Sequence, residues 1–219
     1  MFCGTEDRKA YGDAFKTFAT QAVLLAIAGL CVALDLMLFR NMNENGIVEM
    51  TQISMLIFSS FTFFANARAN KPLRIPLVIL GAIFASAILR ENDGPLDVLL
   101  FHGAWKFLCL PIWIATAAYV ALNFRKTVAQ CAAYSRTASF NYILMGMLIV
   151  GCFAQAVSYK GLWYGLIPGV PDEEIRAVKN IAQETLEILG YSIVVVGALA
   201  IDAERPKAEP QPNNREEKE

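Results

Sequence analysis

The sequence has few of the residues that build most metal and redox sites. Its 219 residues include one histidine, His102, and five cysteines without a CxxC pair. A single histidine excludes bis-histidine haem ligation within one chain, and the cysteine spacing argues against a zinc ribbon or a disulfide framework. The formal net charge of −1 leaves no global basic field for binding nucleic acid. Several common classes of metalloprotein and nucleic-acid-binding protein are therefore set aside.

Charge is also scarce, whereas apolar residues are abundant. Charged residues make up 18% of the chain and hydrophobic residues 56%, which gives a mean hydropathy of +0.42. Long apolar runs alternate with short charged connections, and this pattern is typical of a polytopic membrane protein. The first apolar run is too long for the core of a signal peptide. We therefore expect this run to be retained as the first membrane span.

Six apolar stretches are long enough to cross about 30 Å of hydrocarbon, which takes roughly 20 residues. They cover residues 17–39, 47–67, 73–90, 104–124, 138–158 and 178–201. The predicted fold class is all-α, a polytopic membrane protein with a six-transmembrane-helix bundle. After the third stretch, Gly94 and Pro95 break the chain, and the LDVLLFHG that follows is too short to span. This segment predicts a short interfacial or re-entrant element between helices 3 and 4.

The distribution of lysine and arginine predicts the orientation. Thirteen of these residues lie before span one, between spans two and three, between spans four and five, or after span six, and six lie on the other side. Positive charge favours the cytoplasmic side, so we expect both termini in the cytoplasm. The predicted organisation is a cytoplasmic segment (1–16), a transmembrane domain (17–201) and a disordered cytoplasmic tail (202–219). The predicted location is the inner (plasma) membrane of a bacterium.

Ionisable groups gather on the side predicted to be extracytoplasmic, and the cytoplasmic halves of the spans have almost nothing comparable. Helical spacing places Glu184 and Glu187 on one face of the last span. We therefore expect the polar groups of separate spans to meet in one pocket. These residues are Asp35, Glu49, Gln52, Arg90, Glu91, Asp93, Asp97, His102, Lys106, Glu184 and Glu187.

Ionisable groups inside a membrane usually mark a functional site, so the sequence favours a membrane-embedded enzyme. We expect a hydrolase or transferase that is open to the outer leaflet and acts on a lipid or lipid-linked substrate. The candidate catalytic residues are Glu49, Glu184, Glu187 and His102. The same four residues are the candidate ligands of a divalent metal ion, the one cofactor considered. The candidate substrate-binding residues are Arg90, Lys106, Asp93 and Asp97.

Other interpretations stay open at this point. Arg90 and Lys106 could neutralise the three glutamates in a purely structural ion-pair cluster. The chain could be a non-catalytic membrane subunit or a lipid-binding partner of a larger complex. A proton-coupled carrier is the third alternative, although polar residues are not expected to continue through the cytoplasmic halves. The expected partners are membrane lipids and either another protein or a second copy of this chain, with no nucleic acid.

Overall fold

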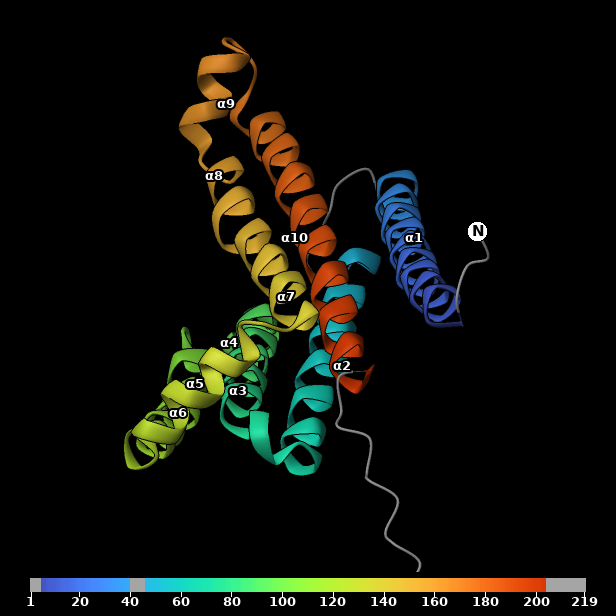
Figure 1. Ribbon diagram of the computed structural model, residues 1–219. Coiled ribbons are helices and arrows are strands. Elements are labelled where there is room, and N and C mark those ends of the chain that lie inside the picture. The colour runs from blue at the N-terminus through green and yellow to red at the C-terminus, as the bar shows by residue number, and fades with distance from the viewer. Residues whose placement is uncertain (1–4, 40–45, 204–219) are drawn as a thin grey trace, which may run out of the picture.

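The computed structural model describes residues 5–39 and 46–203, and every regular element in these two ranges is a helix (Figure 1). The four longest elements are α1 (Thr5–Phe39), α2 (Ile47–Ala69), α5 (Ala104–Leu122) and α10 (Asp172–Ala203). The others are η1 (Lys71–Leu73), α3 (Arg74–Glu91), α4 (Asp93–Leu99), α6 (Phe124–Tyr134), α7 (Ala138–Leu148), the π-helical η2 (Ile149–Ala154), α8 (Gln155–Val157) and α9 (Lys160–Leu166).

Six helical segments are long and apolar enough to cross a membrane, which confirms the predicted fold class. They cover Tyr11–Leu38, Ile47–Ala69, Lys71–Glu91, Ala104–Leu122, Ala138–Val157 and Asp172–Ile201. Each overlaps one of the six stretches expected from the sequence. The cytoplasmic placement of the termini and the bacterial inner membrane remain predictions. The tail beyond residue 203 lies outside the described residues, and the segment 1–16 is continuous with α1 from residue 5 onward.

The short element expected between spans three and four is α4, which has seven residues. Its apolar side chains face outward, with Val98 91% and Leu99 77% exposed. Gly103 then adopts φ 79° immediately before α5, a left-handed conformation that glycine adopts without steric penalty. The chain thus turns at Gly103 into the next span.

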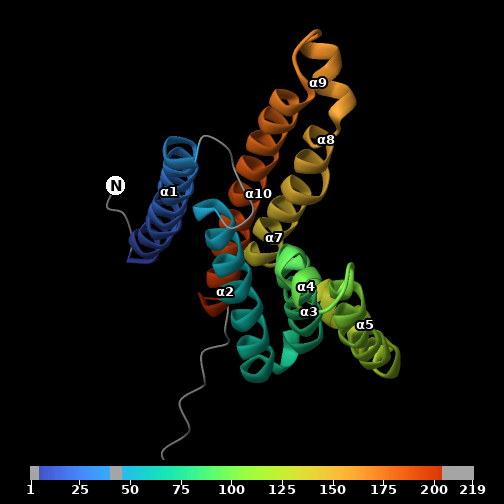
Figure 2. The same ribbon diagram turned by 180° about the vertical axis from the view of Figure 1, so that it is seen from behind.

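The centre of the bundle is formed by α2, α3, α7 and α10 (Figures 1 and 2). Figures 1 and 2 show α1 on one side of this centre and α5 with α6 on the other. Helices α7 and α10 approach closely through glycines, because a Cβ added at Gly146 would lie 2.6 Å from the Gly190 carbonyl oxygen. By contrast, α5 buries only Ala104 and Cys109. Most of the α5 surface is therefore available to lipid or to a partner.

Helix α10 is longer than a membrane requires. Its 32 residues correspond to about 48 Å of helix, whereas the hydrocarbon is about 30 Å thick. Figures 1 and 2 show α9 and the first turns of α10 extending beyond the end of α1. The first turn of α10 carries Asp172, Glu173 and Glu174, which suits the positive end of the helix dipole. We infer that this projecting part lies in the headgroup region or in water.

Uncharged polar side chains continue along α2 beyond the charged groups at its start. Besides Gln52 near the start, the buried polar residues of this helix and its C-cap are Ser59, Ser60, Thr62, Asn66 and Asn70. We expected polar residues not to continue through the halves of the spans that lie away from the charged groups, and for α2 this expectation was wrong. These residues are uncharged and interrupt the apolar pattern only briefly, so a hydropathy profile does not reveal that they share a buried face.

Candidate functional site

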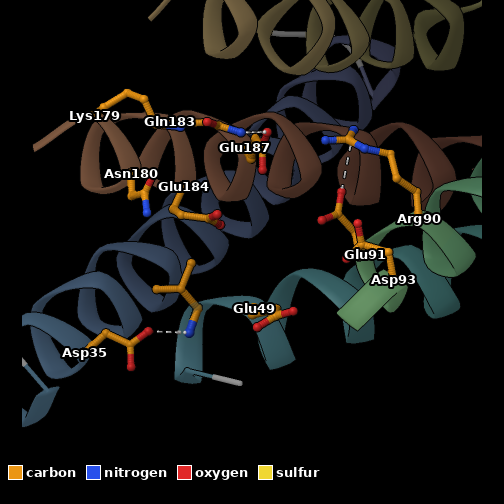
Figure 3. Close-up of a pocket in the computed structure, with 11 residues that line it drawn as sticks. Asp35, Glu49, Arg90, Glu91, Asp93, Lys179, Asn180, Gln183, Glu184 and Glu187 are labelled. Atoms are coloured by element: carbon orange, nitrogen blue, oxygen red, sulfur yellow. Dashed lines mark hydrogen bonds and ion pairs between the residues drawn. The ribbon is translucent and has the colours of Figure 1, made fainter. Parts of the chain in front are cut away.

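An open cavity of about 530 Å³ lies where α1 and α3 end, α2 begins and α10 passes by (Figure 3). This volume falls within the range of small-molecule sites. The eleven lining residues come from α1, α2, α3, α4 and α10. They are Asp35, Val48, Glu49, Arg90, Glu91, Asp93, Lys179, Asn180, Gln183, Glu184 and Glu187. Six of these are acids and two are cations, so full ionisation gives the lining a formal charge of −4.

Asp35 connects the end of α1 to the beginning of α2. Its side chain is 1% exposed. The backbone N–H groups of Ile47 and Val48 donate to its two carboxylate oxygens, each at 2.8 Å. The first N–H groups of a helix have no partner within the helix, and a carboxylate at this end is also favoured by the dipole. Asp35 thus caps α2 from a different helix and fixes one wall of the cavity.

Glu184 is positioned by a buried amide. Gln52 on α2 is 0% exposed, and its Nε2 donates to Glu184 Oε2 at 2.8 Å. Figure 3 shows Glu184 projecting from α10 toward the first turn of α2. A hydrogen bond to a carboxylate is shorter and stronger than one between neutral groups. Gln52 therefore holds the Glu184 carboxylate at the cavity wall.

The second end of the cavity joins α10 to the end of α3. Glu187 is 1% exposed and accepts a hydrogen bond from Gln183 Nε2 at 3.0 Å. Glu91 accepts one from the Tyr191 hydroxyl at 2.9 Å, and Arg90 Nη1 lies 3.8 Å from Glu91 Oε1. A buried carboxylate is unfavourable unless it is paired and hydrogen-bonded. This end of the cavity therefore concentrates negative charge beside a single arginine.

The structure brings five of the predicted site residues to the cavity. Glu49, Arg90, Asp93, Glu184 and Glu187 all line it. Spans two, three and six meet at one end of the bundle as expected, whereas the fourth span, which was expected to contribute Lys106, does not line the cavity. Chemical roles for these residues remain proposals.

The other three predicted residues, Asp97, His102 and Lys106, do not line the cavity. The His102 side chain is 98% exposed, and its Nδ1 lies 2.6 Å from Asp97 Oδ2. Asp97 Oδ1 also accepts the Gly103 N–H at 2.7 Å. This backbone hydrogen bond and the contact with His102 lower the pKa of Asp97. Lys106 Nζ lies 5.7 Å from the centre of the Trp105 ring. The contacts of Asp97 with His102 and Gly103 stabilise the turn into α5.

A metal ion was the candidate cofactor for Glu49, Glu184, Glu187 and His102. Across residues 5–39 and 46–203, no group of three His, Cys, Asp or Glu side chains is arranged to hold a metal ion. His102 lies outside the cavity that the three glutamates line.

Sequence reasoning did not assign a site role to several residues that build the cavity. Asp35, Gln52 and Glu91 were expected from the sequence among the polar groups of the pocket, but without a chemical role. The positions 180, 183, 184, 187 and 191 recur at helical spacing on one face of α10. That periodicity is a signal from which the polar face could have been found.

The sequence matches no protein-family model, no curated protein and no solved structure.

Proposed function

We propose that this chain is a membrane-embedded enzyme that acts on a lipid or lipid-linked substrate with a positively charged headgroup. The cavity would take the headgroup at the outer leaflet, and Glu184 and Glu187 would form the acid–base pair. One observation carries the proposal, namely that six carboxylates and only two cations line a single open cavity. A cation entering this space would offset the repulsion among the carboxylates.

The position of the cavity along α10 supports a substrate that approaches from the bilayer. From Glu184 to Ile201, α10 rises about 26 Å, which is close to the thickness of the hydrocarbon. If the end of α10 lies at one membrane surface, Glu184 lies near the other, at the level of lipid headgroups. A headgroup could then enter the cavity while its acyl chains stay in the membrane.

The two kinds of charge in the cavity suit a zwitterionic headgroup. The carboxylates would bind an ammonium group, and Arg90, whose side chain is 43% exposed, would bind a phosphate. Glu184 would accept the proton of a water or hydroxyl that attacks an ester bond of the lipid, and Glu187, protonated before the step, would donate its proton to the leaving oxygen as that ester bond breaks. General acid–base catalysis of this kind contributes typically 10²–10⁴-fold to a rate.

A lipid-conversion assay tests the proposal. Purified protein in nanodiscs of phosphatidylethanolamine or phosphatidylglycerol is incubated, and the lipids are analysed by mass spectrometry. We expect conversion of the zwitterionic lipid and a loss of roughly a hundredfold in Glu184→Gln. Glu173→Gln is the matched control, because Glu173 is an exposed acid in the first turn of the same helix.

Binding is measured on the same samples by native mass spectrometry. Retention of phosphatidylethanolamine but not of phosphatidylglycerol, weakened by Glu187→Gln, would support the cavity as the headgroup site. Equal retention of the two lipids together with no new product would overturn the proposal. If the glutamate variants change thermal stability but leave lipid binding untouched, the acids are a structural cluster and the proposal also fails.

A further inference from the structure

The unpartnered buried polar atoms of the described chain are concentrated on one helix. Four buried side-chain atoms in residues 5–39 and 46–203 have no hydrogen-bonding partner among protein groups. They are Gln52 Oε1, Ser59 Oγ, and Nδ2 and Oδ1 of Asn70. All belong to α2 or to its C-cap residue. Because an unpaired buried polar atom is destabilising, three such residues on one helix require an explanation.

These three residues lie in line along the helix. A separation of seven residues leaves Ser59 about 20° from Gln52 around the axis, and eighteen residues bring Asn70 back to the same direction. Along the axis, Ser59 lies about 10 Å and Asn70 about 27 Å from Gln52. The second distance is close to the thickness of the hydrocarbon. The unpartnered atoms therefore mark one face of α2 from the cavity to the opposite end of the bundle.

Ser59 differs from other hydroxyl residues of the spans. Ser54, Ser86 and Ser192 each donate to the backbone carbonyl four residues earlier, at 2.7–2.9 Å. This is the usual arrangement for serine within a helix. Ser59 is 1% exposed, yet its hydroxyl has no such partner. It is therefore available to a water molecule or to a proton that passes along the face.

The same face connects with the acidic cavity at one end. Gln52 donates to Glu184, which lines the cavity. Toward the other end, Asn66 is 1% exposed and donates to the Thr62 carbonyl. Between Ser59 and Asn66 lies Phe63, which is 0% exposed and whose ring stacks on Phe84 at 5.6 Å. The face thus has polar residues at both ends, with the buried side chains of Leu56 and Phe63 between them.

We propose that this face of α2 is a proton path across the membrane. Water held by Gln52, Ser59 and Asn70 would carry the proton, since polar sites of this kind are where buried water binds. Glu184 would take a proton from the aqueous cavity and pass it to this water, and the proton would leave at the Asn70 end. Leu56 and Phe63 would form an apolar constriction, as such side chains do in other membrane pores. One proton moves down its gradient, and no other bond changes.

Proton flux into vesicles tests this path. The protein is reconstituted into liposomes that contain pyranine, and a potassium gradient with valinomycin drives protons inward. We expect acidification faster than in protein-free vesicles, and loss of this excess rate in Ser59→Ala and in Glu184→Gln. Ser59→Thr, which keeps a hydroxyl, should restore the flux. Ser54→Ala is the matched control, since Ser54 is an exposed serine of the same helix.

Two results would overturn the path: wild-type flux equal to that of protein-free vesicles, or unchanged flux in both Ser59→Ala and Asn70→Leu. The outcome is separable from that of the proposed enzyme, because Ser59 does not line the cavity. Ser59→Ala should keep headgroup binding and lose proton flux. Wild-type protein that binds headgroups without conducting protons would refute the path alone, and protein that conducts protons without converting lipid would refute the enzyme alone.

Discussion

The hydroxyl of Tyr191 on α10 donates a hydrogen bond of 2.9 Å to Glu91 at the end of α3. Tyr191 is 3% exposed, and the two residues are 100 positions apart in the chain. This bond connects the last span to the third beside the acidic cavity, which Glu91 lines. Removing this bond therefore tests how much a polar contact between two spans contributes to the stability of the bundle.

Replacing Tyr191 with phenylalanine removes this hydrogen bond and keeps the ring. We expect the free energy of unfolding to fall by about 1 kcal/mol, because Glu91 loses its hydrogen bond from Tyr191 and keeps the ion pair with Arg90 at 3.8 Å. Unfolding by SDS in mixed micelles, followed by circular dichroism, measures the change. Tyr119→Phe is the control, since Tyr119 lies on the peripheral helix α5. Equal stability of the Tyr191 variant and wild type would show that the bond contributes nothing.

Removing the cap that Asp35 forms should lower the free energy of unfolding more than removing the Tyr191 hydroxyl does. Asp35→Ala leaves the N–H groups of Ile47 and Val48 without their acceptor in a buried position. Hydrogen bonds to charged groups contribute roughly 1.5–3 kcal/mol, and we expect a loss of that order in the same SDS assay. Asp13→Ala removes an exposed acid of the same helix and should change stability little. A loss no greater than that of the control would contradict the structural role of the cap.

The glycine contact between α7 and α10 predicts that a substitution of glycine by alanine destabilises the protein at Gly190 but not at Gly29. A Cβ at Gly190 would lie 2.5 Å from Val150 Cγ2 and 2.9 Å from the Gly146 carbonyl oxygen, so Gly190→Ala must push the helices apart. We expect a loss of about 1–3 kcal/mol. Gly29→Ala meets nothing within 4 Å and should be neutral or slightly stabilising, because alanine favours helix. Thermal denaturation of both variants in detergent compares them.

Acid should loosen the turn between α4 and α5. The pKa of Asp97 is lowered by the Gly103 N–H and by His102, so its folded-state pKa lies below the unfolded value. Its stabilising contribution is then present above the unfolded pKa of about 3.9 and is lost as the pH falls through the folded pKa. Hydrogen–deuterium exchange of residues 97–104, corrected for the intrinsic pH dependence, should rise in that window. Asp97→Asn should remove the transition, and its persistence would assign the transition to another group.

The spans and the meeting of their acids could be predicted because both depend on short-range periodicity. Length and hydropathy define each helix, and the spacing of Glu184 and Glu187 places both on one face. The rotation of a short segment is not defined in this way. Whether His102 faces the cavity depends on the left-handed turn at Gly103, and the seven residues of α4 carry too little amphipathic pattern to fix it.

Long-range polar contacts were also beyond sequence reasoning. The hydrogen bond from Gln52 to Glu184 joins residues 132 positions apart, and its geometry follows from how α2 and α10 pack. Lys179, Asn180 and Gln183 fall in the first turns of the predicted sixth span, and the sequence predicted no site role for them. Because α10 continues past the end of α1, these residues instead form a wall of the cavity.

The carboxylate of Asp35 also bears on how the chain is built during synthesis. A lone first helix would carry this acid at its membrane-exposed end without compensation, which disfavours stable insertion. Once residues 47 and 48 have been synthesised, their two amide N–H groups can donate to the Asp35 carboxylate and join the two helices. The first two helices are therefore suited to leave the translocon as one hairpin, before the remaining four have been made.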